Sequence, residues 1–216
     1  KLIGTKVLPA YEKLYSHLQA LNGNGKNENG LYYYKNGKEY YKVLVAQKTG
    51  SDKTIEEMIE ISDRSIEKCL RKLIKLQKKY PNIINEYRNH KKNIKIVQNP
   101  QNILNKLRQK MVKYYPKAPK VSCKIKYVHK TMEEYTSPAF YMVPAIDSYK
   151  ENVIYVNQAQ TAELYPTLAH EGYPGHLYQT VYYSATKHPP IRDLLSFGGY
   201  TEGWATYCEM LSYYYS

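Results

Sequence analysis

Two histidines and a glutamate stand close together in the stretch HEGYPGH, residues 170–176. Neutral imidazole nitrogens and carboxylate oxygens are common ligands of zinc, which they hold at about 2.1 Å while catalytic sites keep one position for water. Glu171 directly follows the first histidine, so its carboxylate can take the proton of a metal-bound water during attack on a carbonyl group. The residue types therefore predict a hydrolytic zinc centre with His170 and His176 as ligands and Glu171 as the general base.

The spacing of the two histidines conflicts with a regular helix. Residues six apart on an α-helix differ by about 240° in direction and about 9 Å in height, whereas residues four apart nearly share a face. Pro174 has no N–H, and its ring clashes with the carbonyl four residues earlier, while Gly172 and Gly175 permit unusual backbone angles. We therefore expect a bulged or locally unwound helix between Glu171 and His176, which returns the second histidine to the face of the first.

Such a site needs a third ligand, and the nearest candidate in the following predicted helix is Glu202. A carboxylate from a neighbouring helix completes His-His-Glu zinc sites. Glu209 lies about two turns further along the same helical face, where it is either an alternative ligand or a hydrogen-bond acceptor for a histidine N–H. Each residue alone also has an ordinary interpretation: a hydrogen-bonded histidine, or a glutamate that favours a helix N-terminus.

The elements that must position these residues follow from the periodicity of apolar side chains. The clearest helical pattern spans residues 54–80, and the stretch 61–65 is expected to break it in two. Residues 22–30 are rich in Asn and Gly and predict a loop. Further helices are predicted at 4–21 with an interruption at Pro9, at 36–52, at 100–114 and at 198–215.

Alternating and β-branched residues predict strands at 116–130, 139–146 and 152–157, the last two as a hairpin. We therefore expect a mainly α fold of the α+β class, with a small β-hairpin or sheet beside the bulged motif helix. The chain divides in this interpretation into a helical N-terminal part, residues 1–115, and a core with strands and metal-binding helices, residues 116–216.

Charge and cysteine content restrict the other function classes. The formal net charge is +13, but residues 1–150 hold 30 Lys and Arg against 13 Asp and Glu, whereas residues 151–216 hold 2 against 6. The lysines are scattered without an aromatic RNA-reading motif, so a solvated basic surface is favoured over a specific nucleic-acid partner. Three cysteines without a CxxC pair argue against a cysteine zinc cluster or a disulfide framework. No apolar run is long enough to span a bilayer.

The chain resembles a bacterial family in four stretches that occur in order over most of its length. The family is catalogued as domain of unknown function eight-eight-five, and its members look like gluzincin-type zinc metallopeptidases. Its hallmarks, His-Glu-x-x-Pro-Gly-His and later Glu-Gly-Trp-Ala, match residues 170–176 and 202–205. Leu177 is a departure, because many relatives carry a further histidine there. The four stretches are GLYYYKNGKEYY (30–41), AFYMVPAI with NVIYVN (139–157), TLAHEGYPGHLYQ (167–179) and PPIRDLLSFGGYTEGWATYCEML (189–211).

The resemblance implies a zincin-like helical domain that binds Zn2+ through His170, His176 and Glu202. It implies hydrolysis of a peptide or protein substrate, with Glu171 as base, in a bacterial protein that is extracytoplasmic or associated with the cell envelope. Domains of the family run beyond the point where this chain stops, so we expect further residues to complete the cleft. The alternative is a non-catalytic or metal-free binding module on the same scaffold. The oligomeric state is left open.

Zincins hold an extended peptide along an edge strand by backbone hydrogen bonds. Residues 152–157 are the predicted edge strand, with Asn157 at its end, and an ordinary core hairpin is the alternative. Tyr200 and Tyr207 flank Glu202 and can donate a hydrogen bond to an oxyanion. Two further candidates lie in the connector between the ligand-bearing helices, Arg192 and His188.

Overall fold

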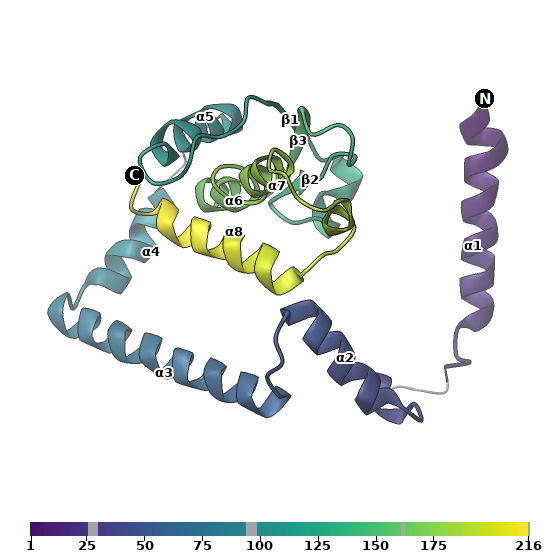
Figure 1. Cartoon of the computed structure of the whole chain (residues 1–216), viewed down its shortest axis with the longest axis horizontal. Coiled ribbons are helices and arrows are strands. Elements are labelled where there is room, and N and C mark those ends of the chain that lie inside the picture. Colours follow the sequence, from purple (N-terminus) through teal and green to yellow (C-terminus); the bar gives the residue numbers. More distant parts are fainter. Residues whose placement is uncertain (26–29, 94–98, 161–162, 216) are drawn as a thin grey trace. The chain divides into compact units, whose positions relative to one another are not determined.

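The computed structural model describes residues 1–25, 30–93, 99–160 and 163–215 and, within them, the side chains of all but residues 90–93. The fold is mainly helical with one small three-stranded mixed sheet, as the sequence predicts (Figure 1). The chain forms two compact units, Lys1–Val45 and Ala46–Ser216. The division at 115/116 stays a prediction. Among the described residues, no helix is long and apolar enough to cross a membrane.

The first predicted helix is present without its expected interruption. A π-helical stretch, Ile3–Val7, leads directly into α1, Leu8–Leu21. Pro9 lies in the first turn of α1, directly after the π-helical stretch, and the helix continues through it. The loop predicted after this helix lies partly outside the described residues, at 26–29.

The second predicted helix is also confirmed. A short 3-10 turn, Gly30–Tyr33, precedes α2, Gly37–Thr49. The helix ends where Gly50 adopts a φ of +63°, a left-handed conformation that residues with a Cβ rarely adopt.

Helix α3, Ile55–Lys79, begins with a capping box. The Thr54 hydroxyl accepts the Glu57 N–H at 3.2 Å, and the Glu57 carboxylate accepts the Thr54 N–H at 2.7 Å. These two bonds satisfy N–H groups that a helix start otherwise leaves without partners. Helix α4, Ile83–Asn93, follows and was not predicted.

The predicted break of α3 at 61–65 is wrong, because the helix continues through this stretch. Ser62, which lies in this stretch, donates its hydroxyl to the Met58 carbonyl at 2.9 Å instead of capping a second helix. A serine that bonds back to the preceding turn is accommodated inside a helix. No residue of α3 is buried, so these polar side chains also remain solvated.

The other elements form the packed core of the second unit. The hairpin of β2 and β3 is antiparallel as predicted, and β1 joins β3 in parallel, so the sheet order is β1-β3-β2. The predicted edge strand is therefore wrong: β3 is central and hydrogen-bonded on both sides, while β2 is an edge. The elements are α5 (Pro100–Met111), β1 (Ser122–Tyr127), a 3-10 helix (Lys130–Tyr135), β2 (Ala139–Met142), β3 (Glu151–Val156), α6 (Leu164–Glu171), α7 (His176–Ser184), a 3-10 helix (Pro190–Asp193) and α8 (Gly198–Ser212).

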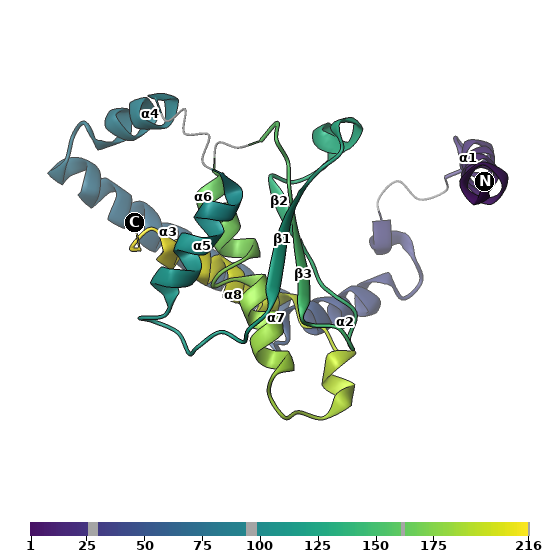
Figure 2. The ribbon, with the colours of Figure 1, turned by 90° about the horizontal axis from the view of Figure 1, so that it is seen from above.

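Helices α5 to α8 lie on one face of the sheet, which Figure 2 shows from above. Burial alternates along β3, where Asn152, Ile154 and Val156 point into the core. Opposite them, Leu104 of α5 and Leu168 of α6 are fully buried. The sheet therefore supplies one wall of the core, and α6, which ends at the motif, is packed between the strands and α8.

Candidate metal centre

The motif helix is interrupted where the Pro-Gly pair predicts it. Helix α6 ends at Glu171 and α7 begins at His176, so the predicted bulge is a complete unwinding of four residues. These residues, 172–175, are all buried. The Gly175 N–H donates to the Ala169 carbonyl at 2.9 Å, which ties the end of the unwound segment back to α6. The Tyr173–Pro174 peptide bond is cis, which was not predicted.

The two glycines of the segment are required by lack of space. A Cβ on Gly175 would lie 1.7 Å from the His170 carbonyl oxygen, and one on Gly172 would lie 2.3 Å from a methyl group of Leu104. Neither glycine has a positive φ. The absence of a Cβ therefore lets the backbone of the segment pack closely against α6 and α5. The sequence alone suggested only that the glycines permit unusual backbone angles.

Helix α8 holds the unwound segment from the other side. The indole N–H of Trp204 donates to the Pro174 carbonyl at 2.9 Å, and the Cys208 thiol donates to the same oxygen at 3.4 Å. Tyr115 packs edge-on against the Trp204 ring, with centroids 5.8 Å apart. The helix that carries Glu202 is thus fixed to the residues immediately before His176.

Three predicted ligands converge in this arrangement. One oxygen of Glu202 lies 3.5 Å from Nε2 of His170 and 3.5 Å from Nε2 of His176. The two imidazole rings are nearly perpendicular, with centroids 4.8 Å apart. Two atoms bonded to one tetrahedral zinc at about 2.1 Å are about 3.4 Å from each other. The two separations from Glu202 match those expected between ligands of one tetrahedral zinc ion.

Glu171 faces the same place. Its carboxylate and one nitrogen from each histidine lie within 4.8 Å of one another and form a group that could hold a metal ion. The other Glu171 interaction is with β2, whose Tyr141 N–H donates to the carboxylate at 2.9 Å. Glu171 is thus oriented by the sheet edge rather than by its own helix.

Glu209 lies behind the first histidine. Its carboxylate is 3.2 Å from Nδ1 of His170. A carboxylate that accepts the Nδ1–H of an imidazole leaves Nε2 unprotonated and aimed at a metal. This separation fits the predicted role of Glu209 as a hydrogen-bond acceptor for a histidine N–H, and its role as a metal ligand stays the alternative.

The electrostatics of the site favour neutral groups. Burial raises the pKa of Glu171, against the opposing effects of the Tyr141 N–H and the nearby His170. Burial lowers the pKa of His176, and the Glu202 carboxylate opposes this shift. A lowered histidine pKa keeps the imidazole in its metal-binding form to lower pH, and a raised carboxyl pKa suits a group that must both accept and release a proton.

The remaining predicted residues are not members of the converging group. Asn157 is fully buried, and its amide donates to the Glu133 and Thr136 carbonyls at 2.8 and 3.1 Å, so its bonds hold a neighbouring turn rather than face a cleft. Tyr200 and Tyr207 are 71% and 55% exposed on α8. Arg192 is exposed, and His188 is paired with Asp193 at 2.8 Å.

Two residues of the site were missed: Tyr141 and Trp204. Trp204 stands within the quoted Glu-Gly-Trp-Ala stretch, so the motif was a signal for it, although nothing in the spacing indicated its partner. Tyr141 acts through its backbone N–H, for which the residue type gives no signal.

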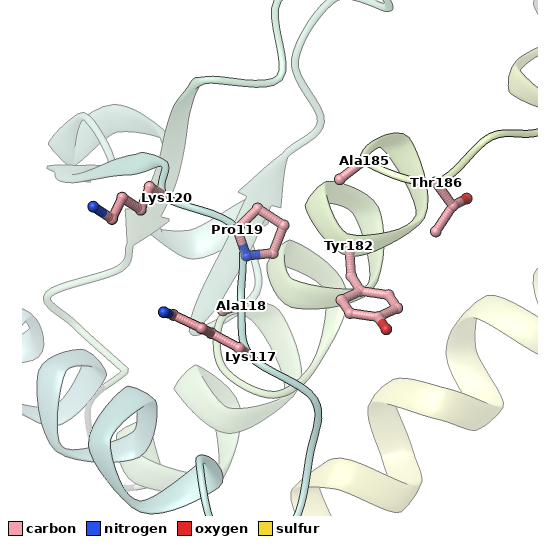
Figure 3. A pocket seen from close by; sticks show the side chains of 7 residues that line it. All are labelled: Lys117, Ala118, Pro119, Lys120, Tyr182, Ala185 and Thr186. Atoms are coloured by element: carbon pink, nitrogen blue, oxygen red, sulfur yellow. The ribbon is translucent and has the colours of Figure 1, made fainter.

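A separate shallow pocket lies beside the C-terminal end of α7 (Figure 3). The ammonium groups of Lys117 and Lys120 point away from Tyr182 across it, so they do not converge on a ligand position. None of the residues that converge at the motif lines this pocket. Its lining residues are Lys117, Ala118, Pro119, Lys120, Tyr182, Ala185 and Thr186.

Comparison with known proteins agrees with this fold. A solved structure from Colwellia psychrerythraea, of a protein described as a "putative lipoprotein", is similar with a TM-score of 0.79 and 19% identity. The similarity covers 99% of this chain and 40% of that one, so this chain spans less than half of its length. No curated protein matches the sequence. A family described as bacterial protein of unknown function (DUF885) matches residues 1–213. Because this match covers nearly the whole sequence, the chain belongs to the DUF885 family.

Proposed function

We propose that the chain carries the metal centre of a gluzincin-type zinc peptidase. In this proposal His170, His176 and Glu202 hold the zinc ion and Glu171 is the general base. The observation that carries it is the position of one Glu202 oxygen, 3.5 Å from Nε2 of both histidines. Residues 26 or more apart in sequence have little reason to converge in this way unless they share a ligand.

The residues have distinct tasks in the proposed reaction. Zinc in a site of this kind lowers the pKa of a bound water and polarises a carbonyl group. Glu171 accepts the proton of the attacking water and passes it to the leaving amine. The Tyr141 N–H holds the Glu171 carboxylate in place, and Glu209 holds the His170 ring.

The sheet edge next to Glu171 supports a peptide as the substrate. The Pro138 carbonyl accepts the Asn157 N–H, so it points towards β3. Direction alternates along an antiparallel strand, so the N–H and C=O of Tyr141 both point away from β3. The N–H is bonded to Glu171, and the C=O is directed to the side where an extended peptide can pair with β2. The substrate strand is thus assigned to β2 instead of β3.

We also propose a location at the bacterial cell envelope. The family is bacterial, and the structurally similar protein is described as a "putative lipoprotein". Fractionation of the source cells, followed by immunodetection of this chain, tests the assignment. Recovery in the cytosolic fraction alone contradicts it.

Metal analysis is the direct test of the zinc site. The purified chain, supplied with zinc and then dialysed, is expected to retain one ion per molecule by mass spectrometry of the metal. His170→Ala and Glu202→Ala should each lower the zinc affinity by more than the 10–100-fold that loss of a hydrogen-bonding neighbour costs. The exposed Glu134 supplies the control, Glu134→Gln. A wild-type chain without stoichiometric zinc contradicts the proposal.

The alternative is a non-catalytic binding module on the same scaffold, and Glu171→Gln separates the two. The amide keeps the acceptor for the Tyr141 N–H but cannot take a proton. We expect zinc to remain bound while cleavage of a quenched-fluorescent peptide library falls by about 10²–10⁴-fold, the usual contribution of a general base. No cleavage by the wild type with zinc bound favours the binding module, and equal cleavage by both chains contradicts the assignment of Glu171 as the base.

A further inference from the structure

Helix α3 carries an apolar stripe that covers nothing in the described part of the chain. Ile59, Ile66 and Leu73 follow one another at intervals of seven residues and are 55%, 57% and 47% exposed. The same stripe includes the exposed Leu70, Leu76 and Tyr80, and it begins at Ile55, which is half-buried. Apolar residues at alternating intervals of three and four form the seam of a two-stranded coiled coil.

The charges of α3 divide between its two halves. Residues 55–67 contain five acidic residues and one arginine, whereas residues 68–79 contain six basic residues and no acidic one. The sign of the charge thus changes at the centre of the helix, between residues 67 and 68. Residues equally distant from this centre have opposite charges in five cases: Glu56 and Lys79, Glu57 and Lys78, Glu60 and Lys75, Asp63 and Lys72, Glu67 and Lys68.

The sixth charged pair about the centre, Arg64 and Arg71, has like charges. Each arginine has a partner on its own helix. A guanidinium nitrogen of Arg64 lies 3.5 Å from a carboxylate oxygen of Glu60, and one of Arg71 lies 2.6 Å from a carboxylate oxygen of Glu67. These pairs reduce the repulsion between the two arginines. The reversal of charge therefore holds for five of the six charged pairs of the helix.

The same reflection also matches part of the apolar stripe. It places Ile59 opposite Leu76 and Ile66 opposite Cys69, which are mixed seam layers of an antiparallel pair of helices, while Leu73 comes opposite Ser62. A parallel pair would place the acidic half on the acidic half and the basic half on the basic half, which is unfavourable. We propose that α3 forms an antiparallel two-stranded coiled coil with α3 of a second copy of this chain.

The chemistry of the surface favours a second copy over other occupants. An anionic partner would meet the acidic half, and a cationic one would meet the basic half. Only a partner with the same charges in reverse order complements both halves, and an antiparallel copy of α3 is such a partner. The apolar seam supplies the affinity, and the charges select the orientation.

Sedimentation equilibrium of the 216-residue chain tests the association. A dimer is expected at about 50 μM, with the dimer fraction falling on dilution. Ile66→Asp should weaken the dimer at least about 10-fold, because it places a charge in the seam. Ile61→Asp is the matched control: Ile61 is 41% exposed on α3 but outside the stripe, so the dimer should persist. A wild-type monomer, or equal weakening by both variants, overturns the proposal and assigns the stripe to another polypeptide.

Disulfide trapping tests the orientation. Chains with Cys69→Ser receive either Ile59→Cys or Leu76→Cys, and the two are mixed under mild oxidation. An antiparallel pair should give mainly the mixed 59–76 disulfide. Preference for 59–59 and 76–76 disulfides indicates a parallel pair and overturns the proposal. Circular dichroism of each variant confirms that α3 remains helical.

Discussion

The contacts that stabilise helix α3 join residues three or four apart, whereas residues 170–176 are held in addition by contacts from α8 and β2, which are distant in sequence. No residue of α3 is buried, while all four residues of the unwound segment are. The helix is thus specified by its own neighbours and the segment by distant elements. Substitutions around the unwound segment should therefore cost more stability than substitutions in α3. They should also affect the metal site, whereas substitutions in α3 should act only on that helix.

The largest difference is expected between two leucines. Leu104 is 1% exposed and packs under Gly172, whereas Leu70 of α3 is 52% exposed. Leu104→Ala should lower the free energy of unfolding by about 2–5 kcal/mol through the cavity that it leaves. Leu70→Ala should change it by about 0.5 kcal/mol or less, measured by urea denaturation at a concentration where copies do not associate. Equal costs would remove the distinction between the regions.

Two glycines make a second matched pair. A Cβ on Gly175 meets the His170 carbonyl, whereas a Cβ on Gly203 of α8 meets nothing within 4 Å. Gly175→Ala should destabilise the core by about 1–3 kcal/mol and move His176. Gly203→Ala should be neutral or stabilise α8 by about 0.5–1 kcal/mol, because alanine favours a helix. Thermal unfolding and zinc titration of both variants measure the contrast; a tolerated Gly175→Ala would show that the segment is adaptable.

Trp204→Phe tests whether one hydrogen bond from α8 positions the unwound segment. The phenyl ring keeps most of the packing but has no N–H for the Pro174 carbonyl. We expect zinc affinity to fall by about 10–100-fold, as for other groups that position a ligand. Competition with a chelator gives the affinity, and Tyr214→Phe, at an 81% exposed position, is the control. Unchanged affinity would mean that α8 is positioned without this bond.

The smallest effect is expected at the cap of α3. Thr54→Ala removes the hydroxyl that accepts the Glu57 N–H and should cost about 1 kcal/mol of helix stability. Hydrogen exchange in the first turn of α3 should accelerate, while zinc affinity stays unchanged. A change at the metal site would show that the cap acts beyond its own helix.

The sequence predicts best those features that neighbouring residues determine. Helices α2, α3 and α5 and the β2–β3 hairpin follow from periodicity, caps and turns. The unwinding follows from Pro174, whose ring forbids a regular helix in any fold. The convergence of Glu202 with the histidines was anticipated from the chemistry of metal sites rather than from any pattern of packing.

Features that depend on distant contacts were missed or reversed. The central position of β3 depends on β1, which pairs with it from about thirty residues earlier in the chain. The break was expected in α3 because Ser and Asp usually favour helix caps. In this exposed helix their side chains are accommodated within a continuous helix instead. The hydrogen bond from Trp204 to Pro174 joins residues thirty apart, and neither residue type signals the other.

Trp204 is the single tryptophan of the chain. Its indole therefore dominates the intrinsic fluorescence. The ring is hydrogen-bonded to Pro174, two residues before His176, so the signal originates beside the metal centre. Release of the unwound segment from α8 would expose the ring to water and shift its emission to longer wavelength. The molecule thus contains its own optical reporter, through which assembly of the metal centre can be followed without a label.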